Sequence, residues 1–221
     1  MNDSFRLASD GVYQCDAFQE FLWQKHGFGT RLGNPAADIT LRQIHSNRVL
    51  NANGLTDRER EGDALVTNEV GKSIGIRTAD CVPILLLDCR NRAIAAVHAG
   101  WRGTALEVAK CAIQQMSGDF HTAAADIYAA IGPCIRDCCY EVGSDVAESF
   151  LPLFPEWEPA AGKRKLNLPE ANRRHLEASG VIPSRIFDCG LCTTCQSAQF
   201  FSYRREPENP GRMLASICRL A

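Results

Sequence analysis

Three short apolar runs near the middle of the chain dominate its hydrophobic pattern. They occupy residues 73–78, 82–88 and 93–98 and are rich in Ile, Val and Leu. Runs this short, with many β-branched residues, are typical of buried strands. Similar but weaker patterns predict further strands at residues 126–131, 185–187, 200–203 and 213–219.

Helical signals follow the third run. Thr104, with Glu107 three residues later, matches a capping box and predicts a helix that ends at Gly118. Its inward face is marked by residues at helical spacing, namely Ala105, Val108, Ala109, Ala112 and Met116. A second helix is expected over residues 144–153, and a third from Asn167 to Gly180, with a proline in its first turn.

The mixture of strands and helices in one continuous pattern predicts an α/β fold. No internal repeat or flexible linker divides the sequence, so we expect residues 1–221 to form a single domain. Two polar stretches, residues 53–63 and 152–165, are expected to be surface loops.

Composition narrows the function classes. The 221 residues are 45% hydrophobic and 23% charged, which is ordinary for a globular protein. The formal net charge of -2 offers no broad basic field for nucleic acid or membranes, so we expect small-molecule substrates. The 11 cysteines cannot all pair internally, and neither a secretory apolar segment nor a membrane-spanning run is present in the sequence. We therefore expect a cytoplasmic protein with reduced thiols.

Candidate chemistry gathers at three predicted strand ends. His45, Cys81 and His98 could form a catalytic zinc site, because two imidazoles and a thiolate leave a fourth tetrahedral position open. The plainer interpretation is two hydrogen-bonded histidines and a buried cysteine. Glycines on both sides of Arg102, close to a helix start, would suit an anion site beside the metal, although they could equally be turn residues.

A series of short motifs then points to a known family. The motifs are His26-Gly27-Phe28-Gly29-Thr30-Arg31, Gln43-Ile44-His45-Ser46, Gly62-Asp63-Ala64-Leu65-Val66-Thr67, TADCVPILLLD at 78–88, VHAGWRGTA at 97–105, Ile131-Gly132-Pro133, Cys139-Tyr140-Glu141-Val142-Gly143, Cys192-Thr193 and FFSYRRE at 200–206. In this order they resemble the laccase-domain family, also called multicopper polyphenol oxidoreductases, which includes purine nucleoside phosphorylases. The segment between Arg31 and Gln43 is shorter than is typical of the family.

The resemblance implies a layered α/β/β/α-like arrangement and a catalytic zinc on His45, Cys81 and His98. It also implies phosphorolysis of adenosine, inosine and methylthioadenosine, together with adenosine deamination. Nucleoside and phosphate are then the expected partners. As a hypothesis, Arg102 contacts phosphate, with Arg48 and Arg205 as weaker candidates, while Tyr140 or Glu141 holds the nucleoside. The preferred nucleoside, the dominant reaction and the oligomeric state stay open.

Three alternatives remain. A copper-dependent polyphenol oxidase would need more imidazoles than the five histidines present, or an axial methionine from only three. A cysteine hydrolase or amidase editing peptidoglycan precursors would use Cys81 as its nucleophile. A non-catalytic metal-binding protein would use the segment Cys189-Gly-Leu-Cys192-Thr-Thr-Cys195, with Cys134, Cys138 or Cys139, to hold structural zinc or an iron–sulfur cluster.

Overall fold

A computed structural model of the chain describes residues 4–55, 60–157, 162–208 and 211–221. A six-stranded sheet forms its centre. The strand order is β12 (Ile186–Asp188), β9 (Ile127–Ile131), β7 (Val82–Asp88), β8 (Ile94–Ala99), β5 (Ala64–Thr67) and β4 (Val49–Asn51). The two outer pairs, β12 with β9 and β4 with β5, are parallel, and the inner pairs are antiparallel.

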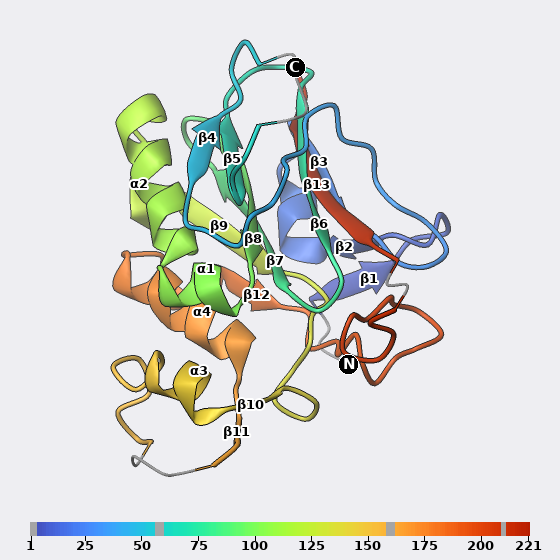
Figure 1. The fold of residues 1–221 in the computed structure, drawn as a ribbon. Coiled ribbons are helices and arrows are strands. Elements are labelled where there is room, and N and C mark those ends of the chain that lie inside the picture. Colours follow the sequence, from blue (N-terminus) through green and yellow to red (C-terminus); the bar gives the residue numbers. More distant parts are fainter. Residues whose placement is uncertain (1–3, 56–59, 158–161, 209–210) are drawn as a thin grey trace.

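A second sheet is antiparallel throughout and packs against the first. Its order is β1 (Phe5–Leu7), β2 (Tyr13–Cys15), β3 (Gln24–Phe28), β13 (Met213–Arg219) and β6 (Ser73–Thr78). The C-terminal strand β13 lies between β3 and β6, so the two ends of the chain meet in one sheet (Figure 1). A two-stranded ribbon, β10 (Glu141–Val142) with β11 (Arg164–Lys165), stands apart.

The helices lie on the other side of the six-stranded sheet, as Figure 1 shows for α1, α2 and α4. They are α1 (Trp101–Ala105), α2 (Val108–Phe120), α3 (Ser144–Glu148) and α4 (Leu168–Ala178). The 3₁₀ turn η1 (Asp16–Glu20) packs beside β2 instead, with its Phe18 in the core between the sheets, whereas η2 (Ala124–Asp126) and η3 (Pro183–Arg185) directly precede β9 and β12. The outer face of the five-stranded sheet is instead approached by an irregular segment, since Gly27 faces Pro35 and Gly75 faces Ala37. The predicted α/β class is confirmed.

Strand β7 explains why the layers stack in this way. All seven of its residues are buried, because both of its faces are covered. Ile84 and Leu86 face the helix-side core, whereas Leu85 and Leu87 face the core between the sheets. The continuous apolar run in the sequence therefore reflects a strand buried on both faces.

The predicted helix from Thr104 to Gly118 is wrong at its start and right from Val108 onward. The chain forms the short helix α1, breaks at Glu107 with φ +59°, and resumes as α2 up to Phe120. Thr104 does not cap a helix. It is buried inside α1, where its hydroxyl oxygen accepts a hydrogen bond from Asn172 Nδ2 at 3.0 Å.

Other expectations had mixed outcomes. Asn167 caps α4 as predicted, accepting from the backbone N–H of Glu170 at 3.1 Å. The helix expected over residues 144–153 ends early at Glu148, and residues 200–203 form no strand. Parts of the two predicted loops, residues 56–59 and 158–161, lie outside the described residues. None of the described helices combines the length and apolar character needed to cross a bilayer.

Candidate active site and metal centre

His45, Cys81 and His98 converge at one end of the six-stranded sheet. One ligand atom from each side chain lies within 4.8 Å of the corresponding atoms of the other two. The imidazole centroids are 5.0 Å apart, and the ring planes meet at 76°. Thus the structure brings together the three residues that the sequence singled out as a ligand set.

Strand pairing accounts for this convergence. Cys81 immediately precedes β7, and the antiparallel register of β7 with β8 places Pro83 opposite His98. His45 arrives on a loop before β4, at the same end of the sheet. The backbone is left-handed at His45, with φ +58°, and at Asp80, the residue before Cys81, with φ +90°. Such conformations in residues other than glycine are uncommon and concentrate at functional sites.

Asp63 is hydrogen-bonded through its carboxylate to the two histidine-bearing segments of the site. Its side chain is fully buried directly before β5. One carboxylate oxygen accepts from His98 Nδ1 and from the backbone N–H of His45, both at 2.9 Å. The other accepts from the backbone N–H and hydroxyl of Ser46, at 2.6 and 2.7 Å. A single carboxylate therefore orients one imidazole and fixes the loop that carries the other.

Sequence analysis missed this role, because Asp63 was assigned to the end of a polar surface loop. The available signal was its position beside Gly62, directly before the apolar segment 64–67. A lone acidic residue at a strand start has no periodicity that would distinguish it from a solvated one. Its function depends on contacts with residues 17 to 35 positions away along the chain.

The electrostatics of the three donors are coupled. Burial raises the pKa of Cys81, but hydrogen bonds with His45 and His98 lower it more, to about 6. Burial lowers the pKa of His98, and hydrogen bonds with Asp63 and Cys81 raise it to about 9. Burial raises the pKa of Asp63, yet hydrogen bonds from His98 and Ser46 bring it down to about 2. The sulfur is therefore mainly a thiolate at neutral pH, which is the form that binds metals.

The donor set fits a zinc ion. Asp63 is an ionised acceptor, so His98 Nδ1 must donate to it, which leaves Nε2 for a metal, as in carboxylate–histidine–zinc arrangements. Gly100 lies against the donors: a Cβ added there would be 3.0 Å from both Cys81 Sγ and His45 Cδ2. Glycine at this position leaves the space between the donors clear.

A cavity of about 670 Å³ opens over these donors. Its volume lies within the range of small-molecule sites, roughly 300–1,000 Å³. Aromatic and cationic side chains line much of it, namely Arg77, Trp101, Arg102, Tyr140, Tyr203, Arg204 and Arg212. Among the described residues, no ion pair joins a carboxylate to Arg102, whose guanidinium stacks 4.3 Å from the centre of the Trp101 ring.

The candidate substrate residues divide into two groups. Arg102 and Tyr140 line the cavity, whereas Arg48, Arg205 and Glu141 do not. The Arg205 guanidinium donates to the carbonyls of Thr193, Thr194 and Phe200 at 2.7–3.0 Å, so it organises a loop. The Glu141 carboxylate pairs with Lys163 Nζ at 2.9 Å on the surface.

Arg204 lies in the cavity, and sequence reasoning chose its neighbour Arg205 instead. Backbone contacts decide between them. The Arg204 N–H donates to Asp80 Oδ2 at 2.7 Å, which brings the C-terminal segment to the residue before Cys81. Asp80 also accepts from the hydroxyls of Thr193 at 2.6 Å and Ser202 at 3.0 Å. Both oxygens of this carboxylate are therefore hydrogen-bonded. The cavity lining is cationic because, of the described residues, it contains four arginines, Arg77, Arg102, Arg204 and Arg212, against this one carboxylate.

The sequence matches one family model and is similar to proteins with assigned activities. A family model described as multi-copper polyphenol oxidoreductase laccase matches residues 13–220. Adenosine deaminase RL5, from an unknown prokaryotic organism, is 38% identical over 234 residues, covering 97% of this chain and 89% of that protein. Purine nucleoside phosphorylase YlmD of Geobacillus stearothermophilus is 42% identical over 163 residues, covering 71% of this chain but 60% of the relative.

Structural similarity extends further along the chain than the second of these sequence matches. The crystal structure of YlmD from Geobacillus stearothermophilus superposes with a TM-score of 0.87 at 31% identity and covers 99% of each chain. The match of the family model over nearly the whole sequence, the two similar proteins and the shared fold agree with one another. The chain therefore belongs to the multi-copper polyphenol oxidoreductase laccase family.

Proposed function

We propose that this protein is a zinc-dependent purine nucleoside phosphorylase that also deaminates adenosine. The convergence of His45, Cys81 and His98 beneath an arginine-lined cavity is the observation that carries the proposal. The names of the two similar proteins, an adenosine deaminase and a purine nucleoside phosphorylase, agree with it. Zinc held by such a set supplies Lewis acidity and makes a neighbouring water more acidic.

Phosphorolysis requires the protein to bind phosphate and the nucleoside side by side. A phosphate oxygen forms a bond to the ribose C1′ while the bond from C1′ to the purine nitrogen breaks, and its electron pair leaves with the purine. Arg102 and Arg204 supply cationic donors for phosphate within the cavity. Trp101, Tyr140 and Tyr203 offer aromatic surface for the purine ring.

Deamination needs a different alignment of the same nucleoside. Water adds to the purine carbon that bears the amino group, and ammonia leaves. Asp63 contributes indirectly, because it fixes the tautomer of His98 and the loop of His45. We infer that orientation of the nucleoside in the cavity decides which of its bonds is broken.

Zinc is preferred over copper because of the residues outside the donor set. His26, His121 and His175 lie elsewhere: between the sheets, after α2 and in α4. Met116 and Met213 are buried in separate apolar clusters, and no methionine of the described residues lines the cavity. The axial sulfur of a blue copper site and the many imidazoles of a multicopper cluster thus have no source there.

A second candidate is supported by the lowered pKa of Cys81. A thiolate beside two imidazoles could act as the nucleophile of a hydrolase or amidase. The two proposals differ in their dependence on metal. A hydrolase of this type keeps its activity after chelation and loses it to a thiol alkylator, whereas the phosphorylase is inactivated by chelation and restored by zinc.

The decisive experiment incubates the purified, zinc-loaded protein with adenosine, with and without phosphate, and separates the products. We expect adenine and ribose 1-phosphate only with phosphate, and inosine under both conditions. Cys81→Ala should abolish all of these products, while Cys111→Ala, which alters a partly buried cysteine outside the cavity, should keep them. Absence of every product from the zinc-loaded protein would exclude the proposal.

Arg102 allows a sharper kinetic test. Arg102→Ala should raise KM for phosphate about 10- to 100-fold, because a charged hydrogen bond contributes roughly 1.5–3 kcal/mol, and should change KM for adenosine little. Arg90→Ala is the matched control, since Arg90 is exposed and pairs with Asp126 away from the cavity. Equal changes in both KM values would remove the phosphate-binding role.

A further inference from the structure

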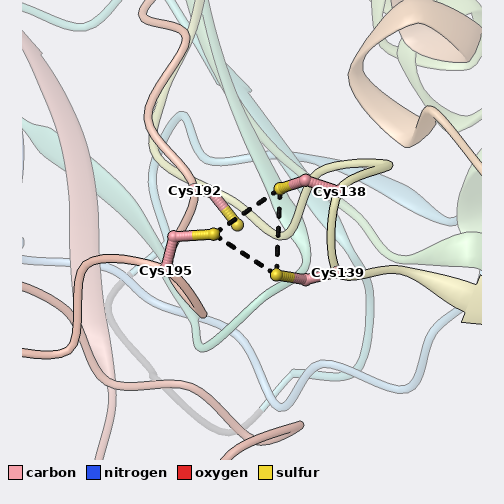
Figure 2. Close-up of side chains that lie close together, drawn as sticks. All are labelled: Cys138, Cys139, Cys192 and Cys195. Atoms are coloured by element: carbon pink, nitrogen blue, oxygen red, sulfur yellow. Dashed lines mark hydrogen bonds between the residues drawn. The ribbon is translucent and has the colours of Figure 1, made fainter.

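A second cluster of metal-binding side chains lies outside the candidate active site. Cys138 and Cys139 follow β9, and Cys192 and Cys195 follow β12. Their four sulfur atoms all lie within 4.8 Å of one another and turn toward a common centre (Figure 2). Three of the sulfur pairs are separated by 3.8, 3.6 and 3.3 Å.

The backbone holds the two cysteine segments in register. The backbone of Cys134 forms an isolated parallel β-bridge with that of Cys192. In this bridge the Cys134 N–H donates to the carbonyl of Leu191 at 3.3 Å, and the Thr193 N–H donates to the carbonyl of Cys134 at 3.0 Å. Beside this bridge, the Arg136 guanidinium grips the Asp188 carboxylate with two bonds of 2.8 and 2.7 Å. The cluster is thus assembled by contacts that do not involve its sulfurs.

We propose that Cys138, Cys139, Cys192 and Cys195 bind one structural zinc ion in a tetrahedral site. A tetrahedron with zinc–sulfur bonds of about 2.3 Å has edges of about 3.8 Å, close to the observed sulfur separations. Cys192 and Cys195 have the two-residue spacing typical of a zinc-binding turn.

The geometry separates this site from the one that the sequence motif suggests. Cys189, the first member of the repeated cysteine pattern, is buried among Leu191, Phe200 and Met213 and is not in the cluster. A multi-iron cluster holds its cysteines on different irons around a core of bridging sulfides. Four sulfurs this close to one another instead match a single ion.

Oxidation to a disulfide is the main competitor. Cys139 and Cys195 are the closest of the printed pairs, at 3.3 Å, and Cys138 and Cys195 are exposed. One disulfide would nevertheless join only two of the four sulfurs and would not explain why the other two lie within 4.8 Å of them. The mutual approach of all four favours one shared ion.

The site lies where it could stiffen the wall of the cavity. Tyr140, which lines the cavity, directly follows Cys139. Thr193 directly follows Cys192, and its hydroxyl donates to Asp80, the residue before Cys81. An ion that joins the two segments would therefore restrict motion of both the cavity wall and the backbone that leads to Cys81.

The test measures metal content on protein purified under reducing conditions. Cys81→Ala, which lacks one ligand of the first site, should retain one zinc per chain, and its X-ray absorption should show four sulfur neighbours at about 2.3 Å. Adding Cys195→Ser to this variant should remove that zinc. Adding Cys189→Ala or Cys218→Ser instead should not, because neither residue belongs to the cluster.

Three results would overturn the proposal: no zinc in Cys81→Ala, iron in place of zinc, or an intact mass lowered by the two hydrogens of a disulfide. The X-ray measurement on Cys81→Ala decides the matter even if the Cys195 variant fails to fold. Because the readout is the ion itself, it is independent of whether the protein turns over nucleosides.

Discussion

At the residue scale, Asp63 is central to the active-site geometry. Its buried carboxylate accepts hydrogen bonds from two residues of the His45 loop and from His98. A neutral amide at this position would keep the shape but lose the charge and part of the accepting capacity. Such a substitution would therefore disturb the orientation of both imidazoles, whereas it would remove no contact with the substrate.

We predict that Asp63→Asn lowers zinc affinity about 10- to 100-fold, the usual effect of removing a partner that orients a metal-binding histidine. Competition with a chromophoric chelator measures the change. Asp88→Asn is a matched control, because Asp88 is equally buried and accepts backbone N–H bonds at the far end of β7. Equal affinity in the wild type and Asp63→Asn would contradict the role assigned to Asp63.

At the element scale, three neighbouring strands carry the residues of the site at the same end of the six-stranded sheet. Cys81 precedes β7, His98 lies near the end of β8, and Asp63 precedes β5. Because β8 runs antiparallel to both of its neighbours, its end lies beside their starts. Helix α2 packs on β8 and β5, so its stability supports the strands that carry the site.

We predict that Gly118→Ala stabilises the protein by about 0.5–1 kcal/mol, because alanine loses less backbone entropy in a helix. Gly118 is exposed within α2, and a Cβ there would meet nothing within 4 Å. Gly132→Ala is the contrasting variant, since its Cβ would collide with the Phe28 ring, at a cost of about 1–3 kcal/mol. Urea unfolding measures both, and a destabilised Gly118→Ala would contradict the helix geometry.

At the scale of the whole molecule, the packing of two sheets buries a titratable group. His26 lies in β3, where its Nε2 accepts from the backbone N–H of Cys15 at 2.9 Å and Nδ1 lies 3.0 Å from Gln24 Oε1. Burial, with a smaller contribution from Arg6, lowers the pKa of His26 to about 4. The imidazole therefore stays neutral in the folded protein where it would be protonated in the unfolded chain.

This difference links stability to pH. Above the unfolded pKa of 6.5, neither state is protonated at His26, and its stabilising contribution is fully present. As pH falls from about 6.5 to 4, the unfolded chain takes up the proton first, so the free energy of unfolding decreases. The loss should approach about 3 kcal/mol, at roughly 1.4 kcal/mol for each unit of pKa shift.

Urea unfolding of the wild type and His26→Gln between pH 7.5 and pH 4.5 tests the prediction. The variant should be less stable at the upper pH but lose less free energy on acidification, because glutamine does not titrate. Comparing slopes removes the contribution of the other acid-sensitive groups, which both proteins share. Parallel curves would show that His26 does not control acid stability.

Local patterns determined some parts of this protein. The short apolar run at residues 82–88 predicted a buried strand, and the structure confirms it, with all seven residues of β7 buried. Asn167 marked the start of α4, since a cap acts on backbone three residues away. His45, Cys81 and His98 stood out by chemical type and by the motifs around them.

Tertiary structure decided the contacts between residues distant in the chain. Only the folded sheet brings Asp63 to His98, places Arg204 rather than Arg205 in the cavity, and divides the cysteine pattern so that Cys189 is buried in a core. The break in the helix at Glu107 likewise reflects packing, since Thr104 is held inside α1 by Asn172. Local patterns act through propensity over a few residues, whereas these outcomes depend on which strands pair and which segments share one end of the sheet.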